Sequence, residues 1–142
     1  MANPNFTVKQ GVILETRLAE KASATVINPG DLVSVDSGGL IIQKVTSAAA
    51  GRTAFCLNGA AAGTTIAEVT QGNNFSLIGT ASGNLAKANR GLAYDVTNST
   101  GTQTINLSST TYGDLRVSPF SDGGTVGATT GVEVSIVNPI FF

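Results

Sequence analysis

The feature that most constrains this chain is a regular alternation, across residues 28–75, of turn-forming residues with runs of branched apolar residues. The sequences NPGD (28–31) and DSGG (36–39) can reverse the chain, since Asn, Asp, Pro and Gly favour turn conformations. The runs at 32–35 and 40–45 are rich in Val, Ile and Leu, which is typical of strands. The pattern predicts that these two runs pair as a β-hairpin.

Two more hairpins are predicted from the same alternation. Residues 53–57 and 64–70 flank NGAAAG, and residues 92–96 and 103–107 flank TNSTG, and both linkers are rich in turn-forming residues. Further strands are expected at 75–78, 115–118 and 132–137. The glycine-rich stretches at 79–91 and 120–131 are predicted as surface loops, the second as the most flexible part of the chain.

Residues 11–24 support two interpretations. Four apolar residues from Val12 to Ala22 would lie on roughly one face of a helix, whereas residues 11–14 and 25–27 also read as short strands. We favour the strands. The whole chain then predicts an all-β fold, a single small β-barrel or β-sandwich domain (jelly-roll-like) of about eight to ten short antiparallel strands.

The N-terminal residues 1–10 are predicted to form an extended arm ahead of the domain at 11–142. Pro4 disfavours a helix around Asn3, and few of these residues could anchor a core. Phe6 and Val8 would share one face of a strand, because side chains alternate along a strand with a period of two. The arm could therefore add its backbone to the sheet edge of a neighbour, the alternative being a frayed terminus.

The last residues, Ile140, Phe141 and Phe142, are large and apolar. Each side chain left in water would cost about 1.5–3 kcal/mol. We expect these residues to dock either on the protein's own core or on another subunit.

The composition favours contact with other protein rather than with nucleic acid. Only 12% of the 142 residues are charged, about half the usual share, and the mean hydropathy is +0.21. A surface of Ser, Thr, Asn, Gly and Ala sheds water easily, which suits contact over a large area. The net charge of −1 and the scattered basic residues argue against a nucleic-acid partner, and no apolar run approaches the ~20 residues of a membrane helix.

The residue types disfavour catalysis. The chain has no histidine, which removes Ser-His-Asp and Cys-His arrangements and histidine metal sites. Its single cysteine, Cys56, lies in the apolar sequence AFCL and is expected to be a buried, inert thiol. The aspartates that could serve a glycosidase pair all fall at predicted turns, where Asp is favoured for its own backbone hydrogen bonds: Asp31, Asp36, Asp95, Asp114 and Asp122. Of these, only Asp36 or Asp122 could contribute to a calcium site with loop carbonyls, and no run of alternating acidic ligands supports one. We therefore expect a non-enzymatic protein without metal or cofactor.

The runs GDLVSV, GGLII and AFCLNGAAAGTTIAEVTQGNNF together resemble the small all-β capsid decoration, or cement, proteins of tailed bacteriophages. The similarity covers roughly residues 28–77, and an N-terminal arm is in keeping with it. The resemblance implies a structural protein of the virion, made in the host cytoplasm and bound to the outer surface of the expanded capsid. Its partners would be the major capsid protein and copies of itself, commonly as a homotrimer, with no membrane and no direct nucleic-acid contact.

Proteins of this kind hold adjacent major capsid subunits together against the pressure of the packaged DNA. The residues expected to contact the capsid are those of the arm: Asn3, Pro4, Phe6 and Val8. The residues expected to dock on a subunit or on the core are Ile140, Phe141 and Phe142.

Two other function classes remain open. A trimeric β-fold nucleotidohydrolase of the dUTPase type is similar in length, but its motifs are not recognisable here. A carbohydrate-binding or fibre-attached module usually exposes aromatic residues for stacking on sugar rings, and this chain has no Trp and only two Tyr, Tyr94 and Tyr112.

Overall fold

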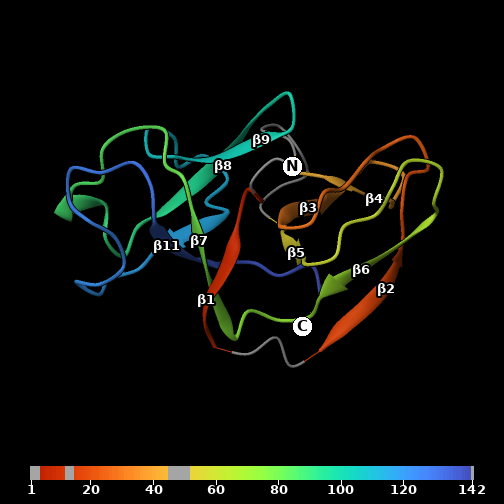
Figure 1. The fold of residues 1–142 in the computed structure, drawn as a ribbon, viewed down its shortest axis with the longest axis horizontal. Coiled ribbons are helices and arrows are strands. Elements are labelled where there is room, and N and C mark those ends of the chain that lie inside the picture. The colour runs from red at the N-terminus through yellow and green to blue at the C-terminus, as the bar shows by residue number, and fades with distance from the viewer. Residues whose placement is uncertain (1–3, 12–14, 45–51, 142) are drawn as a thin grey trace.

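The computed structural model describes residues 4–11, 15–44 and 52–141, and in these it contains eleven strands and one short 3-10 helix (Figure 1). The elements are β1 (Thr7–Gly11), β2 (Thr16–Glu20), β3 (Asp31–Val35), β4 (Ile41–Gln43), β5 (Ala54–Cys56), β6 (Ile66–Thr70), β7 (Phe75–Gly79), η1 (Lys87–Asn89), β8 (Ala93–Ser99), β9 (Thr102–Asn106), β10 (Leu115–Val117) and β11 (Val132–Ile136). The prediction of an all-β fold is confirmed.

The strands form three antiparallel sheets. A six-stranded sheet has the order β1-β7-β11-β10-β8-β9, a three-stranded sheet the order β4-β3-β5, and β2 pairs with β6 alone. Figure 1 shows the six-stranded sheet on the left, the three-stranded sheet in the middle and the β2–β6 ribbon on the right. The sheets do not close into a barrel, so the domain is a small sandwich.

The three-stranded sheet is buried on both faces, because apolar side chains alternate across it. Leu32 and Phe55 point to one side and join the cluster packed on the six-stranded sheet. Val33, Ala54 and Cys56 point to the other side and join the cluster packed under the β2–β6 ribbon. Burial on both faces explains why β5 is apolar throughout and why four successive residues of β3 are buried.

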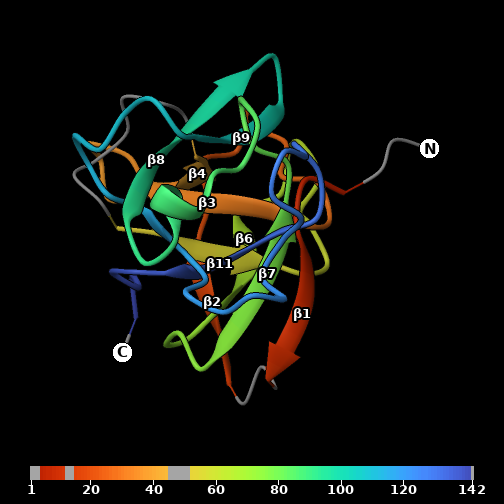
Figure 2. The ribbon, with the colours of Figure 1, turned by 90° about the vertical axis from the view of Figure 1, so that its left-hand side faces the viewer.

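Residues 4–11 are part of the domain, which corrects the expected division between an arm at 1–10 and a domain at 11–142. β1 pairs with β7 at the edge of the six-stranded sheet (Figure 2). Phe6 is 1% exposed and lies in the larger core cluster, against Gly79, where a Cβ would stand 2.3 Å from its ring. Local sequence patterns could not predict this contact, because the space for the Phe6 ring depends on the missing side chain of Gly79, 73 residues along the chain.

Two predicted hairpins are present and one is wrong. β3 pairs with β4, and β8 pairs with β9 through a two-residue turn at Thr100 and Gly101, both with positive φ (49° and 92°). This turn is shorter than the expected five-residue linker at 97–101, because β8 continues to Ser99. β5 and β6 do not pair with each other: β5 joins β3, and β6 joins β2.

The two glycine-rich loops, expected to lie free on the surface, are tied to each other. The backbone N–H of Leu85 donates to the carbonyl of Ala128, and that of Gly127 donates back to Leu85. Ala81 and Leu85 are buried in the core. The segment 120–131 is therefore held by hydrogen bonds along its length rather than left as a linker.

Side-chain amides join the small sheet to the β8–β9 hairpin. The Gln103 amide donates to the carbonyls of Leu32 and Lys44 and accepts the N–H of Leu32. Asn5 donates to Asp31 and to the carbonyl of Gly101, which anchors the start of the chain at the same junction. These buried polar groups are satisfied, so they fix how the layers sit on each other without a desolvation penalty.

A buried ion pair spans the same two layers. The Nζ of Lys44, next to β4, lies 3.1 Å from the Oδ1 of Asp114, next to β10, and both side chains are 1% exposed. The two atoms lack the alignment of a hydrogen bond, so the attraction is coulombic. The other carboxylate oxygen, Asp114 Oδ2, accepts the N–H of Val96.

Replacing Phe6 by Ala should lower the free energy of unfolding by about 3–5 kcal/mol, because it opens a cavity in the core. The matched control Val8→Ala, two residues along on an exposed side chain, should change it by less than about 0.5 kcal/mol. Urea unfolding of both variants measures the difference. Equal effects would contradict the core position of Phe6.

Replacing Lys44 by Met should lower the free energy of unfolding by about 3–5 kcal/mol, because it leaves the Asp114 carboxylate buried without a countercharge. Adding Asp114→Asn removes that charge and keeps an oxygen for the Val96 N–H. The double variant should therefore recover a large part of the loss in the same urea titration. A double variant as unstable as the sum of both single variants would contradict this account.

Candidate interaction surfaces

Two outer strands, β1 and β2, are exposed along most of their length. β1 pairs only with β7, and β2 pairs only with β6, within the described part of the chain. The far edge of β9, the other outer strand of the large sheet, is covered by residues 80–82, which bond to Ile105. β4, β5 and β6 also have one strand partner each, but their residues are more buried than those of β1 and β2. β1 and β2 are thus the most exposed of these outer strands, and a strand from another chain could add to either.

The β1 edge is largely solvent exposed, with only Lys9 partly covered. Val8 is 36% exposed, and Pro4 is exposed although it lies beside Gly30, so the side chains of both residues are accessible to a partner. Phe6 does not, because its ring is in the core, and this corrects its expected role in capsid contact. Asn3 lies outside the described residues.

The β2–β6 ribbon carries exposed apolar side chains on its outer face. Leu18 is 72% exposed and lies opposite Glu68, and Ile66 is 54% exposed and lies opposite Glu20. Leu18 and Ile66 therefore lie on one face, diagonally across the ladder. Sequence reasoning missed this surface because residues 11–24 also suggested a helix, and the strands favoured there, at 11–14 and 25–27, did not include β2.

The C-terminal residues dock on the protein itself. Ile140 and Phe141 are partly buried against the smaller core cluster, and Ile140 bonds through its N–H to the carbonyl of Thr53. The Phe141 carbonyl accepts the N–H of Gly72, and the Arg17 guanidinium lies 5.7 Å from the centre of the Phe141 ring. Both residues therefore dock on the protein's own core, which is one of the two expected docking sites. Phe142 lies outside the described residues.

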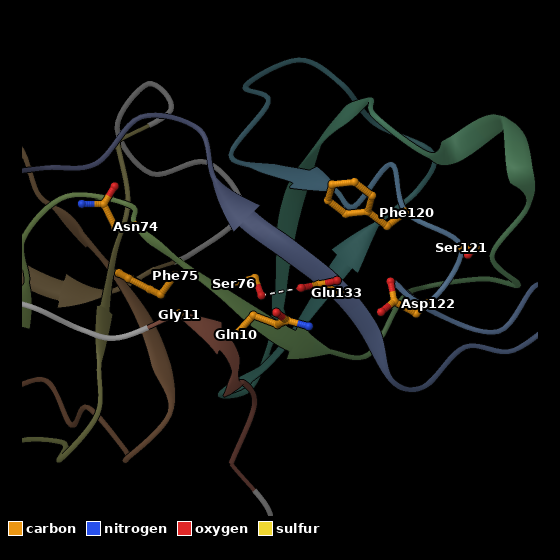
Figure 3. A pocket seen from close by; sticks show the side chains of 9 residues that line it. All are labelled: Gln10, Gly11, Asn74, Phe75, Ser76, Phe120, Ser121, Asp122 and Glu133. Carbon is orange, nitrogen blue, oxygen red and sulfur yellow. Dashed lines mark hydrogen bonds between the residues drawn. The ribbon is translucent and has the colours of Figure 1, made fainter.

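An open hollow of about 730 Å³ lies beside the β1 edge, on the outer face of the large sheet (Figure 3). Its lining comes from the end of β1, from β7 and β11, and from the loop after β10: Gln10, Gly11, Asn74, Phe75, Ser76, Phe120, Ser121, Asp122 and Glu133. Glu133 is the least exposed of its acidic groups, and its Oε2 accepts a 2.5 Å hydrogen bond from Ser76. The alternating run 132–137 could have revealed Glu133, since it points away from its apolar neighbours.

The aspartates considered as catalytic or calcium ligands hold separate parts of the fold. Asp36 accepts the N–H groups of Gly38 and Leu40, as its predicted turn role requires. The carboxylates of Asp31 and Asp114 make the buried contacts described above. Asp95 lies within β8, not at a turn, and Asp122 lies at the hollow. Among the described residues no three His, Cys, Asp or Glu side chains gather as a metal site would require.

Asp95 fastens the loop that follows β9. Its carboxylate accepts the Ser109 hydroxyl and the N–H groups of Tyr112 and Gly113. Burial raises the pKa of Asp95, but these hydrogen bonds together outweigh burial and lower the pKa below its ordinary value. The prediction of a buried Cys56 is confirmed, and burial raises the pKa of its thiol, which disfavours the reactive thiolate.

No helix in the described ranges is long and apolar enough to cross a membrane. A comparison of the chain with protein-family models and with curated proteins finds no match.

Asp95→Asn should destabilise the protein by roughly 1–3 kcal/mol at neutral pH, because charge-assisted hydrogen bonds are lost. The folded state holds the pKa of Asp95 below its unfolded value, so the stabilisation is complete above about pH 4 and is lost as pH falls through the folded pKa. The gap between wild type and variant in urea unfolding should shrink below about pH 4. A gap that stays constant with pH would contradict the assignment.

Proposed function

We propose that this protein is a structural protein of a phage virion that binds the outer surface of the expanded capsid. There it joins adjacent major capsid protein subunits against the pressure of the packaged DNA. The observation that carries the proposal is the open edge of β1, a solvent-exposed strand on a rigid sandwich that can accept a strand of the capsid protein.

The physical properties of the surface support this function. Cementing requires contact area and rigidity, and the low charge of the chain limits the water that must be stripped from the interface. The edge strand is itself anchored by Phe6 in the core, so force on a bound capsid strand would pass directly into the sandwich. A flexible arm would yield under the same force. The resemblance of residues 28–77 to cement proteins led to the same proposal.

Self-association fits the β2–β6 ribbon better than the β1 edge. Leu18 and Ile66 are exposed on one face there, and burying each against a copy of the chain would gain about 1–2 kcal/mol. The ribbon and the β1 edge belong to different sheets, so the two contacts would use different strands. A closed ring of copies, such as a homotrimer, would then repeat each capsid contact by symmetry.

Cosedimentation with purified heads of the phage that encodes the chain tests the proposal. The protein should bind expanded heads and not unexpanded ones. Val8→Lys should weaken binding at least tenfold, because a charge at the strand edge opposes strand addition. Leu92→Lys, also an exposed apolar residue on the large sheet's side of the fold, is the matched control and should bind normally. Failure of the wild-type protein to bind expanded heads would overturn the proposal.

A further inference from the structure

The hollow lies over the face of the large sheet and not along the β1 strand edge proposed to contact the capsid, although Gln10 and Gly11 of β1 line it, and its lining has a distinct chemistry. Phe120 is 67% exposed, the second most exposed large apolar side chain among the described residues. It comes from the loop after β10, as does Asp122, and Figure 3 shows both near Glu133. Gln10 and Asn74 line the hollow from β1 and from the turn before β7. The hollow thus combines one open aromatic face with several hydrogen-bonding groups.

The charge in the hollow is nearly balanced. The Lys9 ammonium lies 3.6 Å from the Glu133 carboxylate and donates to the carbonyl of Asp122 at 2.5 Å. This leaves the exposed Asp122 carboxylate as the unpaired charge. A single negative charge disfavours phosphate and other anions, and the carboxylate of Glu133 is already matched by Lys9 and Ser76, so a strongly cationic ligand gains little. The balance favours a neutral polar ligand.

The hydrogen-bonding groups around the hollow are free to bind. Within the part of the chain that the structure describes, the side chains of Gln10, Asn74 and Asp122 make no hydrogen bond to another residue. An amide offers both donors and an acceptor, and a carboxylate accepts two hydrogen bonds side by side. Adjacent hydroxyl groups on a ring match this set, since each hydroxyl both donates and accepts.

We propose that the hollow binds a neutral carbohydrate. The negative face of the Phe120 ring attracts the weakly positive C–H groups on the flat side of a sugar. The side chains of Asp122, Gln10 and Asn74 form hydrogen bonds with the ring hydroxyls. Glu133, bonded to Ser76 and paired with Lys9, forms the base of the hollow. The aromatic contact comes from a phenylalanine rather than from Tyr94, which is buried, or from Tyr112.

A glycan array carrying neutral hexose and N-acetylhexosamine oligosaccharides, probed with the full chain, tests the inference. The strongest ligand is then titrated by NMR, where an open site of this kind should give a Kd on the order of 1 mM or lower. Phe120→Ala should weaken binding at least tenfold, and Phe120→Trp should keep or improve it. Val126→Ala, an exposed apolar residue in the same loop, is the matched control and should leave Kd unchanged.

Three results would overturn the inference: no neutral glycan bound, a Kd unaffected by Phe120→Ala, or equal loss in the Val126→Ala control. Cosedimentation of the Phe120→Ala variant with expanded heads separates this site from the capsid contact. Head binding should be unchanged, because Phe120 lies on the sheet face and not on the β1 edge. Loss of head binding in this variant would instead assign the hollow to the capsid and overturn the carbohydrate site.

Discussion

The fold depends on the burial of one small sheet on both of its faces. β3 and β5 each send alternate side chains into two separate clusters, so this small sheet contributes to both parts of the core. The turn chemistry on either side of β3 fixes its register, and a shift by one residue would exchange Leu32 with Val33 between the clusters. The outer layers then follow: the six-stranded sheet covers one face and the β2–β6 ribbon the other. A central layer of this kind makes the domain resistant to bending, which is what both proposed contacts require.

Apolar packing alone does not set the angle between these layers. The polar contacts at their junction fix how the layers are oriented relative to each other. The Gln103 amide and the Lys44–Asp114 pair both run from the small sheet to the large one. Each group would be costly if the layers slid apart, because its partner would remain buried and unpaired. The same junction holds Asn5, so the position of the β1 edge is coupled to the packing of the interior. The edge is exposed, yet the chain just before it is held to the interior by Asn5 and by Phe6 in the core.

Local sequence patterns predicted most of the strands but few of the strand pairings. The period of two and the turn residues placed β3, β4 and β7 to β11 closely, since these signals act over a few residues. The pairing of β5 and β6 failed because NGAAAG is compatible with a hairpin, while the choice of β3 and β2 as partners depends on burial across the whole sandwich. Phe6 was misjudged for the same reason: its cavity is formed by Gly79, far along the chain. The hollow was missed because β1, β7, β11 and the loop after β10 meet only in space.

An exposed strand edge is a risk as well as a binding site, since it invites pairing with any other edge. In β1 the risk is limited by a register shift at Lys9, which breaks the regular spacing of the ladder. The ammonium of Lys9 is in turn held by Glu133 and by the carbonyl of Asp122. The residue that moderates the edge is therefore the same residue that balances the charge of the hollow. A ligand in the hollow that drew Lys9 away from Glu133 would alter the edge, so the two surfaces, although separate in contact, share one side chain through which each can influence the other.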